Sequence, residues 1–317
     1  MGCVAGKRAS ISRLFLEALG RPLERSVSLR RHSNFRIGGR ADFFYAAQSA
    51  DELKACLGFA RSRGLSFYVI GAGTNILFAD EGFRGLLIKS DVRGIEREKG
   101  GRVEAFSGTP LSDLVEFASA EGLRGLEFAA GIPGTVGGAV FGNAGAFGRC
   151  IGDALEEAVI LDGQGREIRV GNAYFNFEYR HSSLKKKHLT LLKAVFRLDR
   201  GDKKEIKDRI EENLERRKSR HPSVRMAYAG SYFKNPVLAG GTRASAGFLL
   251  EKVGAKAMRV GGAAVYPGHA NFIINLGRAR AADVLALARE LKDRVRAEFG
   301  VELEEEVIYL PADFSMP

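Results

Sequence analysis

The sequence predicts an α+β fold, with three consecutive units behind a short N-terminal extension. Three observations carry this prediction. The length of 317 residues exceeds one typical domain, short apolar runs alternate with amphipathic helical segments, and two glycine-rich turns stand far apart, each in its own unit. We set the extension and the three units at residues 1–24, 25–91, 92–202 and 203–317.

The extension, residues 1–24, is predicted to be a helical lead-in or a loosely held tail. In the first unit, Ser49 and Glu52 have the spacing of a capping box, which predicts that a helix begins there. The apolar run at 67–70 then predicts a buried strand, and a second short strand is expected at 86–88.

The second unit contains a helix start at Thr109-Pro110, with Thr109 as the N-cap and proline at the first helical position. The glycine-rich segment 131–148 follows this helix. Strand-like apolar runs complete the unit, at 158–161, 167–170 and 189–198.

The third unit opens with a charged helix over 204–219, which we expect to bridge two domains. Its basic C-terminal end suits the helix dipole. Residues 281–299 form a strongly amphipathic helix that Gly300 closes. An apolar-rich strand over 301–310 is predicted to follow it.

The composition is that of an ordinary globular protein, with 45% hydrophobic and 27% charged residues. The net charge of +11 suits anionic ligands, but the basic residues are mostly scattered among acidic ones. We therefore expect no nucleic-acid partner. The histidines are far apart, so we expect no metal site. Sparse cysteines, and the lack of a signal peptide or a transmembrane run, predict a cytoplasmic protein without membrane insertion; we expect a monomer.

Two glycine-rich turns are the strongest functional signal. The first, at 71–75, follows an apolar strand, but Ile76 stands where a dinucleotide-binding fingerprint needs its third glycine. We interpret it as a different phosphate-binding turn, with backbone amides and the side chains of Thr74 and Asn75 as donors; a plain strand-ending turn is the alternative. The second, 131–148, has small and apolar residues between its glycines. This favours a packed backbone close to a ligand, and a tight structural corner is the alternative.

Nine motifs, in chain order, are SNFRIGG (33–39), GAGTNIL (71–77), GIPGTVGGA (131–139), NAGAFG (143–148), YRHSS (179–183), AGSYFKNP (229–236), AGFLLE (246–251), HANFIIN (269–275) and LEEEV (303–307). Together they resemble the UDP-N-acetylenolpyruvoylglucosamine reductase (MurB) family. The resemblance covers residues 30–310, and many motifs in the family's order are more specific than any one of them. The sequence HANF points to the shorter, type II subgroup.

The resemblance implies an FAD-binding fold of the vanillyl-alcohol-oxidase type, in which two subdomains hold FAD and a third, α+β domain binds substrate. It also implies an FAD-dependent oxidoreductase, in which NADPH drives the reduction of UDP-N-acetylglucosamine enolpyruvate to UDP-N-acetylmuramate for peptidoglycan synthesis. We expect non-covalent FAD, because the glycine-rich region has no histidine and only Cys150 nearby. The residues expected to bind FAD are Arg36, Gly71, Ala72, Gly73, Thr74, Asn75, Gly131, Ile132, Pro133, Gly134, Thr135, Gly137, Gly138, Asn143, Ala144 and Gly145.

Three residues match the family's catalytic positions: Arg180, Ser231 and Glu306. Hydride addition to C3 of an enolpyruvyl group leaves negative charge at C2, delocalised into the carboxylate, which needs a cation and then a proton. Arg180 suits the first need, because a guanidinium stays charged and binds a carboxylate bidentately; a surface salt bridge is the alternative. Ser231 resembles the proton donor, with Lys234 as an activating neighbour; by itself a Gly-Ser pair is typical of a turn.

Glu306 resembles a second acid group that stabilises the enol together with Arg180. Strand alternation does not choose between Glu305 and Glu306, so the choice depends on the family pattern Leu-Glu-x-Glu-Val. The chain departs from the family before His269, where Tyr266 replaces the usual serine, which leaves the local loop shape open. The residues expected to contact substrate or nucleotide are Tyr179, Arg220, Lys234, Asn235 and His269.

Two other functions stay open on the sequence. One is a flavin oxidase or dehydrogenase of the same fold that acts on another anionic substrate. The other is a non-catalytic, nucleotide-binding regulatory protein. Such a protein would be expected to lose Arg180, Ser231 or Glu306, and all three are present.

Overall fold

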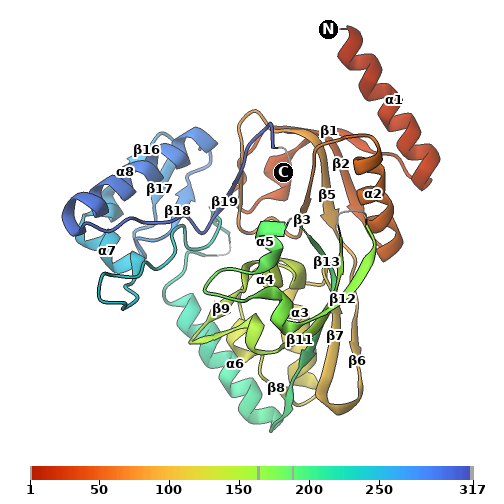
Figure 1. The fold of residues 1–317 in the computed structure, drawn as a ribbon. Coiled ribbons are helices and arrows are strands. Elements are labelled where there is room, and N and C mark those ends of the chain that lie inside the picture. Colours follow the sequence, from red (N-terminus) through yellow and green to blue (C-terminus); the bar gives the residue numbers. More distant parts are fainter. Residues whose placement is uncertain (1, 163–164, 188, 224, 315–317) are drawn as a thin grey trace.

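The computed structural model describes residues 2–162, 165–187, 189–223 and 225–314. Residues 1 and 315–317, the outermost residues of the predicted extension and third unit, lie outside the described part. Figure 1 shows three groups of helices and strands that meet near the middle of the molecule, with α1 projecting from one side.

The first group is a four-stranded sheet in the order β1-β2-β5-β3. β1 and β2 are antiparallel, whereas β2, β5 and β3 run parallel. Helix α2 begins as predicted, because the Ser49 hydroxyl accepts a hydrogen bond from the Glu52 N–H at 3.2 Å. The elements are β1 (Glu24–Ser28), the 3-10 helix η1 (Leu29–His32), β2 (Arg40–Ala47), α2 (Ala50–Ser62), β3 (Phe67–Ile70), β4 (Ile76–Phe78) and β5 (Phe83–Ser90).

Helix α1 (Gly2–Leu19) is the predicted helical lead-in. Its fully buried Phe15 packs edge-on against Tyr45 of β2 and Phe59 of α2, with ring centroids 5.1 and 5.0 Å away. The Arg21 guanidinium, just after the helix, pairs with the Glu52 carboxylate at 2.7 Å. The C-terminal end of the extension is therefore docked on the first sheet.

The second group is a five-stranded antiparallel sheet in the order β12-β11-β13-β7-β6. The predicted cap at Thr109 is wrong: α3 starts at Leu111 without a side-chain cap, and the Thr109 hydroxyl instead donates to the Gly94 carbonyl at 3.0 Å. The main elements are β6 (Ile95–Arg97), β7 (Arg102–Phe106), α3 (Leu111–Ala120), α4 (Val136–Gly142), β11 (Leu155–Leu161), β12 (Glu167–Gly171), α5 (Ser183–Lys187) and β13 (Thr190–Arg197).

Short elements connect this group: η2 (Lys99–Gly101), β8 (Leu123–Arg124), η3 (Glu127–Ala129), β9 (Gly145–Ala146), β10 (Arg149–Cys150), η4 (Ile151–Asp153), η5 (Asn172–Phe175) and β14 (Asp199–Arg200). Helix α6 (Lys203–Lys218), the predicted charged helix, follows them. It lies along the second group, where the buried Asn213 amide donates to the Glu127 carbonyl at 2.9 Å, and it leads to the third group (Figure 1).

The third group is a small antiparallel sheet in the order β15-β18-β17-β16, covered by α7 and α8. Gly300 closes α8 in a left-handed conformation (φ 66°), as predicted. Its elements are β15 (Ala227–Tyr228), α7 (Ala246–Lys252), η6 (Ala255–Ala257), β16 (Arg259–Val260), β17 (Ala263–Val265), β18 (Ile273–Asn275) and α8 (Ala281–Phe299).

The last strand differs from the prediction. Only β19 (Ile308–Leu310) of the expected 301–310 run is a strand, and it pairs in parallel with β4 of the first group, Ile308 opposite Ile76. Because β4 follows the first glycine-rich turn, this pairing brings the segment that precedes β19 to that turn. The first and third groups also share a core, in which Phe35, Ile37 and Leu77 pack with residues of α7 and α8.

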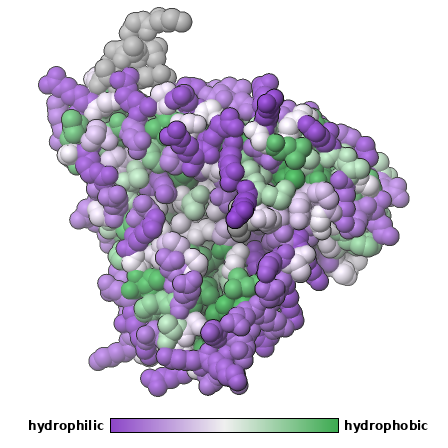
Figure 2. Space-filling model, turned by 180° about the vertical axis from the view of Figure 1, so that it is seen from behind, coloured by the Kyte–Doolittle hydropathy of each residue, from purple (hydrophilic) through white to green (hydrophobic). Residues whose placement is uncertain are grey.

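The outer surface is dominated by polar side chains. Figure 2 shows one face that is largely hydrophilic, with apolar side chains gathered mainly in its lower part. Within the described residues, every helix is too short or too polar to cross a membrane.

Candidate active site

The two glycine-rich turns lie against each other. The Thr74 hydroxyl of the first turn donates to the Pro133 carbonyl of the second at 3.2 Å. At Gly71 a side chain would overlap the Thr135 hydroxyl, and at Gly134 a Cβ would lie 3.2 Å from the Thr74 hydroxyl. The predicted approach of the two turns is therefore present, and glycine permits it at both contacts.

Backbone amides of the first turn are available to a ligand. Among the described residues, the N–H groups of Ala72, Gly73 and Thr74 donate no hydrogen bond. Gly73 is left-handed (φ 68°), and a Cβ there would overlap the His32 carbonyl. Unpaired amides in such turns form a concave anion site. This turn therefore fits the diphosphate of an FAD.

The second turn leads directly into α4. The sequence analysis did not predict this helix, because its segment is rich in glycine. Thr135 caps this helix, because its hydroxyl accepts from the Gly138 N–H at 3.3 Å. The Gly137 N–H donates to the Ser107 carbonyl at 2.8 Å, and the Ile132 N–H to the Ala129 carbonyl at 3.0 Å. The amides of Gly131, Gly134 and Thr135 donate to no described residue, so these three can face a ligand.

Three further predicted cofactor residues shape the site through their own bonds. The buried Asn143 ends α4 in a left-handed conformation (φ 44°), donates to the Glu178 carbonyl at 2.9 Å and accepts from the Gly152 N–H at 3.0 Å. The Ala144 N–H donates back to Ala139 at 2.8 Å. The Asn143 side chain and the Ala144 N–H are therefore both hydrogen-bonded within the protein. The Gly145 carbonyl accepts a hydrogen bond from Arg180.

Arg36 and Asn75 bring the first group to the third. The Arg36 guanidinium donates to the Arg225 carbonyl at 3.3 Å. The Asn75 side-chain amide donates to the Glu306 carbonyl at 3.0 Å, and the Asn75 carbonyl accepts from the Ile308 N–H at 3.1 Å. Asn75 therefore fixes the main chain of a predicted catalytic residue.

Arg180 and Glu306 form the central charged pair. Arg180 Nε lies 2.7 Å from Glu306 Oε1, and both side chains are mostly buried, at 24% and 17% exposure. The angle at Nε is poor for a hydrogen bond, so the contact is an ion pair. Arg180 Nη1 donates to the Gly145 carbonyl at 2.9 Å. The guanidinium thus lies between Glu306 and the glycine-rich segment.

The structure separates the two glutamates that the sequence pattern left open. Phe233 bridges Glu305 in antiparallel fashion, so neighbouring side chains point to opposite faces. Glu305 pairs with Lys292 of α8 at 3.0 Å, whereas Glu306 faces Arg180. The Glu306 N–H also donates to the Tyr232 carbonyl at 2.7 Å.

Ser231 stands two residues before Phe233, which bridges Glu305, and directly before Tyr232, whose carbonyl accepts from the Glu306 N–H. The turn before it is left-handed at Gly230 (φ 75°), and Ser231 itself is half-buried. No hydrogen bond of its hydroxyl is found within the described part of the chain. Tyr232 donates its N–H to the Asn271 carbonyl at 2.8 Å, which anchors the segment on the third group.

The comparison with known proteins decides the family. Two family models match: an FAD binding domain over residues 41–171, and the C-terminal domain of UDP-N-acetylenolpyruvoylglucosamine reductase over residues 221–310. A UDP-N-acetylenolpyruvoylglucosamine reductase from Moorella thermoacetica is 44% identical over 279 residues, 88% of this chain and 90% of that protein. This chain belongs to the MurB family.

Other MurB relatives agree over the same length. A reductase of the same name from Synechococcus sp. is 41% identical over 91% of this chain and 94% of its own length. The crystal structure of MurB from Thermus caldophilus superposes with a TM-score of 0.76 at 34% identity, over 91% of this chain and 99% of that one.

A more distant structure shows the fold alone. The glucooligosaccharide oxidase of Acremonium strictum, whose FAD is 6-S-cysteinyl and 8α-N1-histidyl, superposes with a TM-score of 0.50 at 11% identity, over 92% of this chain and 59% of that one. The predicted α+β FAD-binding fold of the vanillyl-alcohol-oxidase type is confirmed, and the protein is an FAD-dependent oxidoreductase.

The predicted substrate residues of this MurB protein fall into two groups. Tyr179 and Asn235 meet near Arg180: the Asn235 N–H donates to the Tyr179 hydroxyl at 3.3 Å, and the Asn235 side chain accepts from the Ala246 N–H at 3.0 Å. The Lys234 ammonium pairs with the Glu304 carboxylate. These three lie on the segments that carry Arg180 and Glu306.

His269 and Arg220 lie in a second cluster around Phe272. The His269 ring contacts Phe272 with centroids 5.0 Å apart, its Nδ1 accepts from the Asn271 N–H at 3.2 Å, and burial lowers its pKa. His221 contacts Phe272 at 4.9 Å, and burial lowers its pKa to about 4. The Arg220 side chain is exposed beside them.

Three cations near the site escaped the sequence reasoning. Arg217 of α6 donates to the Gly131 carbonyl at 3.0 Å, and burial lowers its pKa. Arg243 stacks on the Tyr179 ring at 4.0 Å, and Lys185 donates to the Arg180 carbonyl at 2.7 Å. Only Arg217 had a usable signal, since it stands four residues after Asn213 on one face of a helix.

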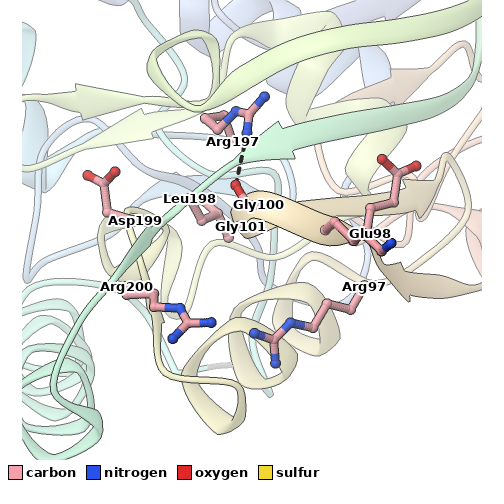
Figure 3. A pocket seen from close by; sticks show the side chains of 9 residues that line it. Arg97, Glu98, Gly100, Gly101, Arg197, Leu198, Asp199 and Arg200 are labelled. Atoms are coloured by element: carbon pink, nitrogen blue, oxygen red, sulfur yellow. Dashed lines mark hydrogen bonds between the residues drawn. The ribbon is translucent and has the colours of Figure 1, made fainter.

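A separate groove of about 660 Å³ lies at the end of the five-stranded sheet. Its charged lining residues come from the β6–β7 and β13–β14 segments and include both signs: Arg97, Glu98, Arg197, Asp199 and Arg200 (Figure 3), with Lys99. Arg197 is already bonded to the Gly100 carbonyl at 2.8 Å and paired with Glu156. None of the predicted site residues lines this groove, so we assign the chemistry to the glycine turns.

Proposed function

We propose that this protein reduces UDP-N-acetylglucosamine enolpyruvate to UDP-N-acetylmuramate, with bound FAD, with NADPH as co-substrate, and with Arg180, Ser231 and Glu306 as its catalytic residues. One observation carries the residue assignment. Arg180 and Glu306 come from different groups of the fold and form a largely buried ion pair of 2.7 Å. The same Glu306 is bonded to Asn75 at the end of the first glycine turn.

Bound FAD would supply the hydride-transfer chemistry, with NADPH as the source of the hydride and C3 of the enolpyruvyl group as its destination. The residues that would hold its diphosphate are Ala72, Gly73 and Thr74 of the first turn, and Gly134 and Thr135 of the second, through their unpaired amides. A non-covalent attachment is supported at Cys150, whose thiol donates to the Asp153 carboxylate at 3.3 Å. Burial raises the pKa of that thiol, which disfavours the reactive thiolate.

Arg180 meets the charge that develops on the substrate. Its guanidinium binds the carboxylate of the enolpyruvyl group as a planar, permanently charged donor. Glu306 fixes the orientation of this guanidinium and shares in stabilising the enol. Ser231 holds its hydroxyl proton for C2, where the second of the product's two new C–H bonds forms; the first forms at C3 with the hydride.

The remaining polar side chains are assigned to the UDP-sugar. Tyr179, Lys234 and Asn235 lie along the segments that carry the catalytic residues, and Lys234 suits a diphosphate because its ammonium is a compact cation. His269 and Arg220 stand further along the third group. We place them as weaker contacts to the nucleotide.

We further infer that the enzyme acts as a monomer in the cytoplasm, without a nucleic-acid or membrane partner. A UDP-sugar substrate of this kind and the free thiols of Cys56 and Cys150 support the location. Light scattering coupled to size-exclusion chromatography tests the monomer: a mass near 34.5 kDa is expected, and a dimer mass would overturn it.

The activity is tested by following flavin absorbance without oxygen. Adding NADPH to the FAD-loaded protein should bleach the visible flavin band, and adding the enolpyruvyl UDP-sugar should restore it with formation of UDP-N-acetylmuramate. UDP-N-acetylglucosamine, which lacks the double bond, is the control and should restore nothing. A protein that takes up no FAD, or a band restored equally by the control, would contradict the proposal.

A further inference from the structure

Lys185 is a cation that contacts the main chain of Arg180. It lies in the short helix α5 (Ser183–Lys187), and its ammonium donates to the Arg180 carbonyl at 2.7 Å. The residue is half-buried, and its ammonium also lies 5.7 Å from the centroid of the Phe141 ring in α4. Lys185 therefore connects the helix that follows the second glycine turn with the main chain of Arg180.

The main chain of Arg180 needs such support, because its conformation is unfavourable. Arg180 is left-handed, with φ 58°, in a tight turn where Glu178 and His181 exchange backbone hydrogen bonds of 3.2 and 3.1 Å. A residue with a Cβ adopts this conformation only when its surroundings hold it there. A hydrogen bond from a charged donor to the carbonyl of that same residue is a strong restraint.

The orientation of this turn decides where the guanidinium points. The side chain of Arg180 reaches Glu306 at 2.7 Å and the Gly145 carbonyl at 2.9 Å, and both contacts depend on the direction of its Cα–Cβ bond. The next residue but one, Ser182, is fully buried and donates to the Phe141 carbonyl at 2.8 Å. The hydrogen bond of Ser182 thus anchors the chain that follows the turn, and Lys185 restrains the Arg180 carbonyl within it.

We propose that Lys185 is a positioning residue for the reduction of the enolpyruvyl group, which holds Arg180 in the left-handed turn that aims its guanidinium at Glu306 and the substrate carboxylate. The inference rests on the role proposed above for Arg180. Burial and the neighbouring Lys234 lower the pKa of the Lys185 ammonium, whereas the carboxylates of Glu306 and Glu304 favour its charged form.

The test compares the two half-reactions in Lys185→Met. Anaerobic stopped-flow absorbance should show flavin reduction by NADPH within about twofold of wild type. Reoxidation by the enolpyruvyl substrate should be slower by about 10- to 100-fold, as expected when a catalytic group is displaced by about 1 Å. Lys186→Met, an exposed neighbour on the same helix, is the matched control and should behave as wild type.

Lys185→Arg should recover most of the lost rate, because a guanidinium also donates to a carbonyl. A normal reoxidation rate in Lys185→Met would overturn the proposal, as would an equal loss in both half-reactions with loss of FAD, which is the mark of a structural residue. Should Lys185→Met not fold, Lys185→Leu, which also lacks a donor, carries the same comparison with the same expected loss.

A double-mutant cycle with Arg180→Lys separates this inference from the proposed function. If Lys185 acts through Arg180, then adding Lys185→Met to Arg180→Lys should slow reoxidation by less than about twofold. If the rate losses of the two single variants multiply in the double variant, the positioning role is overturned. A normal rate in Arg180→Lys alone would instead refute the proposed role of Arg180, whereas an impaired Arg180→Lys beside a normal Lys185→Met would refute only the inference.

Discussion

At the scale of single residues, the acidic run at 304–306 shows what a pattern leaves undecided. Strand alternation places Glu304 and Glu306 on one face and Glu305 on the other, but it names no partner for either face. In the structure each carboxylate has its own cation: Lys234 for Glu304, Lys292 for Glu305 and Arg180 for Glu306. None of these partners is close in sequence, since even Lys292 stands 13 residues from Glu305, so no local rule could have assigned them.

The run provides a matched pair of variants. Glu306→Gln should slow reoxidation of the reduced flavin by the enolpyruvyl substrate by about 100-fold, because it leaves the Arg180 guanidinium without its carboxylate, a contact of the preorganised kind that commonly contributes 10²–10³ in rate. Glu305→Gln removes an outer ion pair with Lys292 and should leave the rate within about twofold. Equal effects of the two changes in stopped-flow measurements would contradict the assignment.

His221 makes stability depend on pH. Burial beside Arg217 lowers its pKa in the folded protein to about 4, from an ordinary value of 6.5. The unfolded chain therefore binds more protons between these values, so this residue's contribution to stability is present above pH 6.5 and is lost as the pH falls toward 4.

The variant His221→Phe keeps an aromatic ring against Phe272 without a titrating group. Urea unfolding at pH 7, 6, 5 and 4.5 should show a free energy of unfolding that falls less steeply with acidity than that of wild type. Parallel pH profiles for the two proteins would show that His221 is not the source of this dependence.

At the scale of elements, the long amphipathic helices were predictable and the glycine-rich helix was not. The ends of α6 and α8 fell within one residue of expectation, because charge and apolar periodicity define them. α4 contains three glycines in seven residues, which lowers its helix propensity. It forms because Thr135 caps it locally and because the Gly137 amide is bonded to the Ser107 carbonyl, a tertiary contact that the sequence does not reveal.

The first glycine turn is predicted to hold the FAD diphosphate, and its requirement for glycine can be tested. Gly73→Ala places a Cβ on the His32 carbonyl at a left-handed position, which displaces the turn and its free amides. The purified variant should contain little or no FAD. Gly58→Ala, inside α2 with nothing near its Cβ, is the control and should keep FAD and gain up to about 1 kcal/mol of stability.

A Gly73→Ala protein that is as yellow as wild type, with an unchanged FAD dissociation constant, would show that this turn does not hold the cofactor. Loss of FAD in both alanine variants would point instead to a general sensitivity of the first group to substitution. The absorbance ratio of flavin to protein is the measurement in each case.

At the scale of the whole molecule, the site exists because the end of the chain returns to its beginning. The pairing of β19 with β4 brings Glu306 to Asn75, and the bridge of Phe233 with Glu305 brings Ser231 beside it. Arg180 reaches this place from the second group. The family motifs predicted that Arg180 and Glu306 act together, and the two side chains form an ion pair. The parallel pairing itself was invisible in sequence, because it joins segments that are distant in the chain.

The pairing of β19 with β4 joins the end of the third predicted unit to the first unit. The boundary between the second and third units at residue 203 stays a prediction. The described part of the last segment packs in parallel on the first group rather than on the third-group sheet. Helix α6 packs mainly on the second group, through Asn213 and Arg217. Sequence periodicity predicts such elements, but it does not say against which group of the fold they pack.

The most direct measurement of the central claim is anaerobic stopped-flow absorbance of Ser231→Ala, with Ser112→Ala, an exposed serine of α3, as control. NADPH should bleach the flavin of both variants at the wild-type rate. The enolpyruvyl UDP-sugar should restore the flavin of the control at the normal rate and that of Ser231→Ala at least about 100-fold more slowly, because C2 lacks its proton donor. Normal reoxidation of Ser231→Ala, or an equal slowing of both steps, would contradict the site described above.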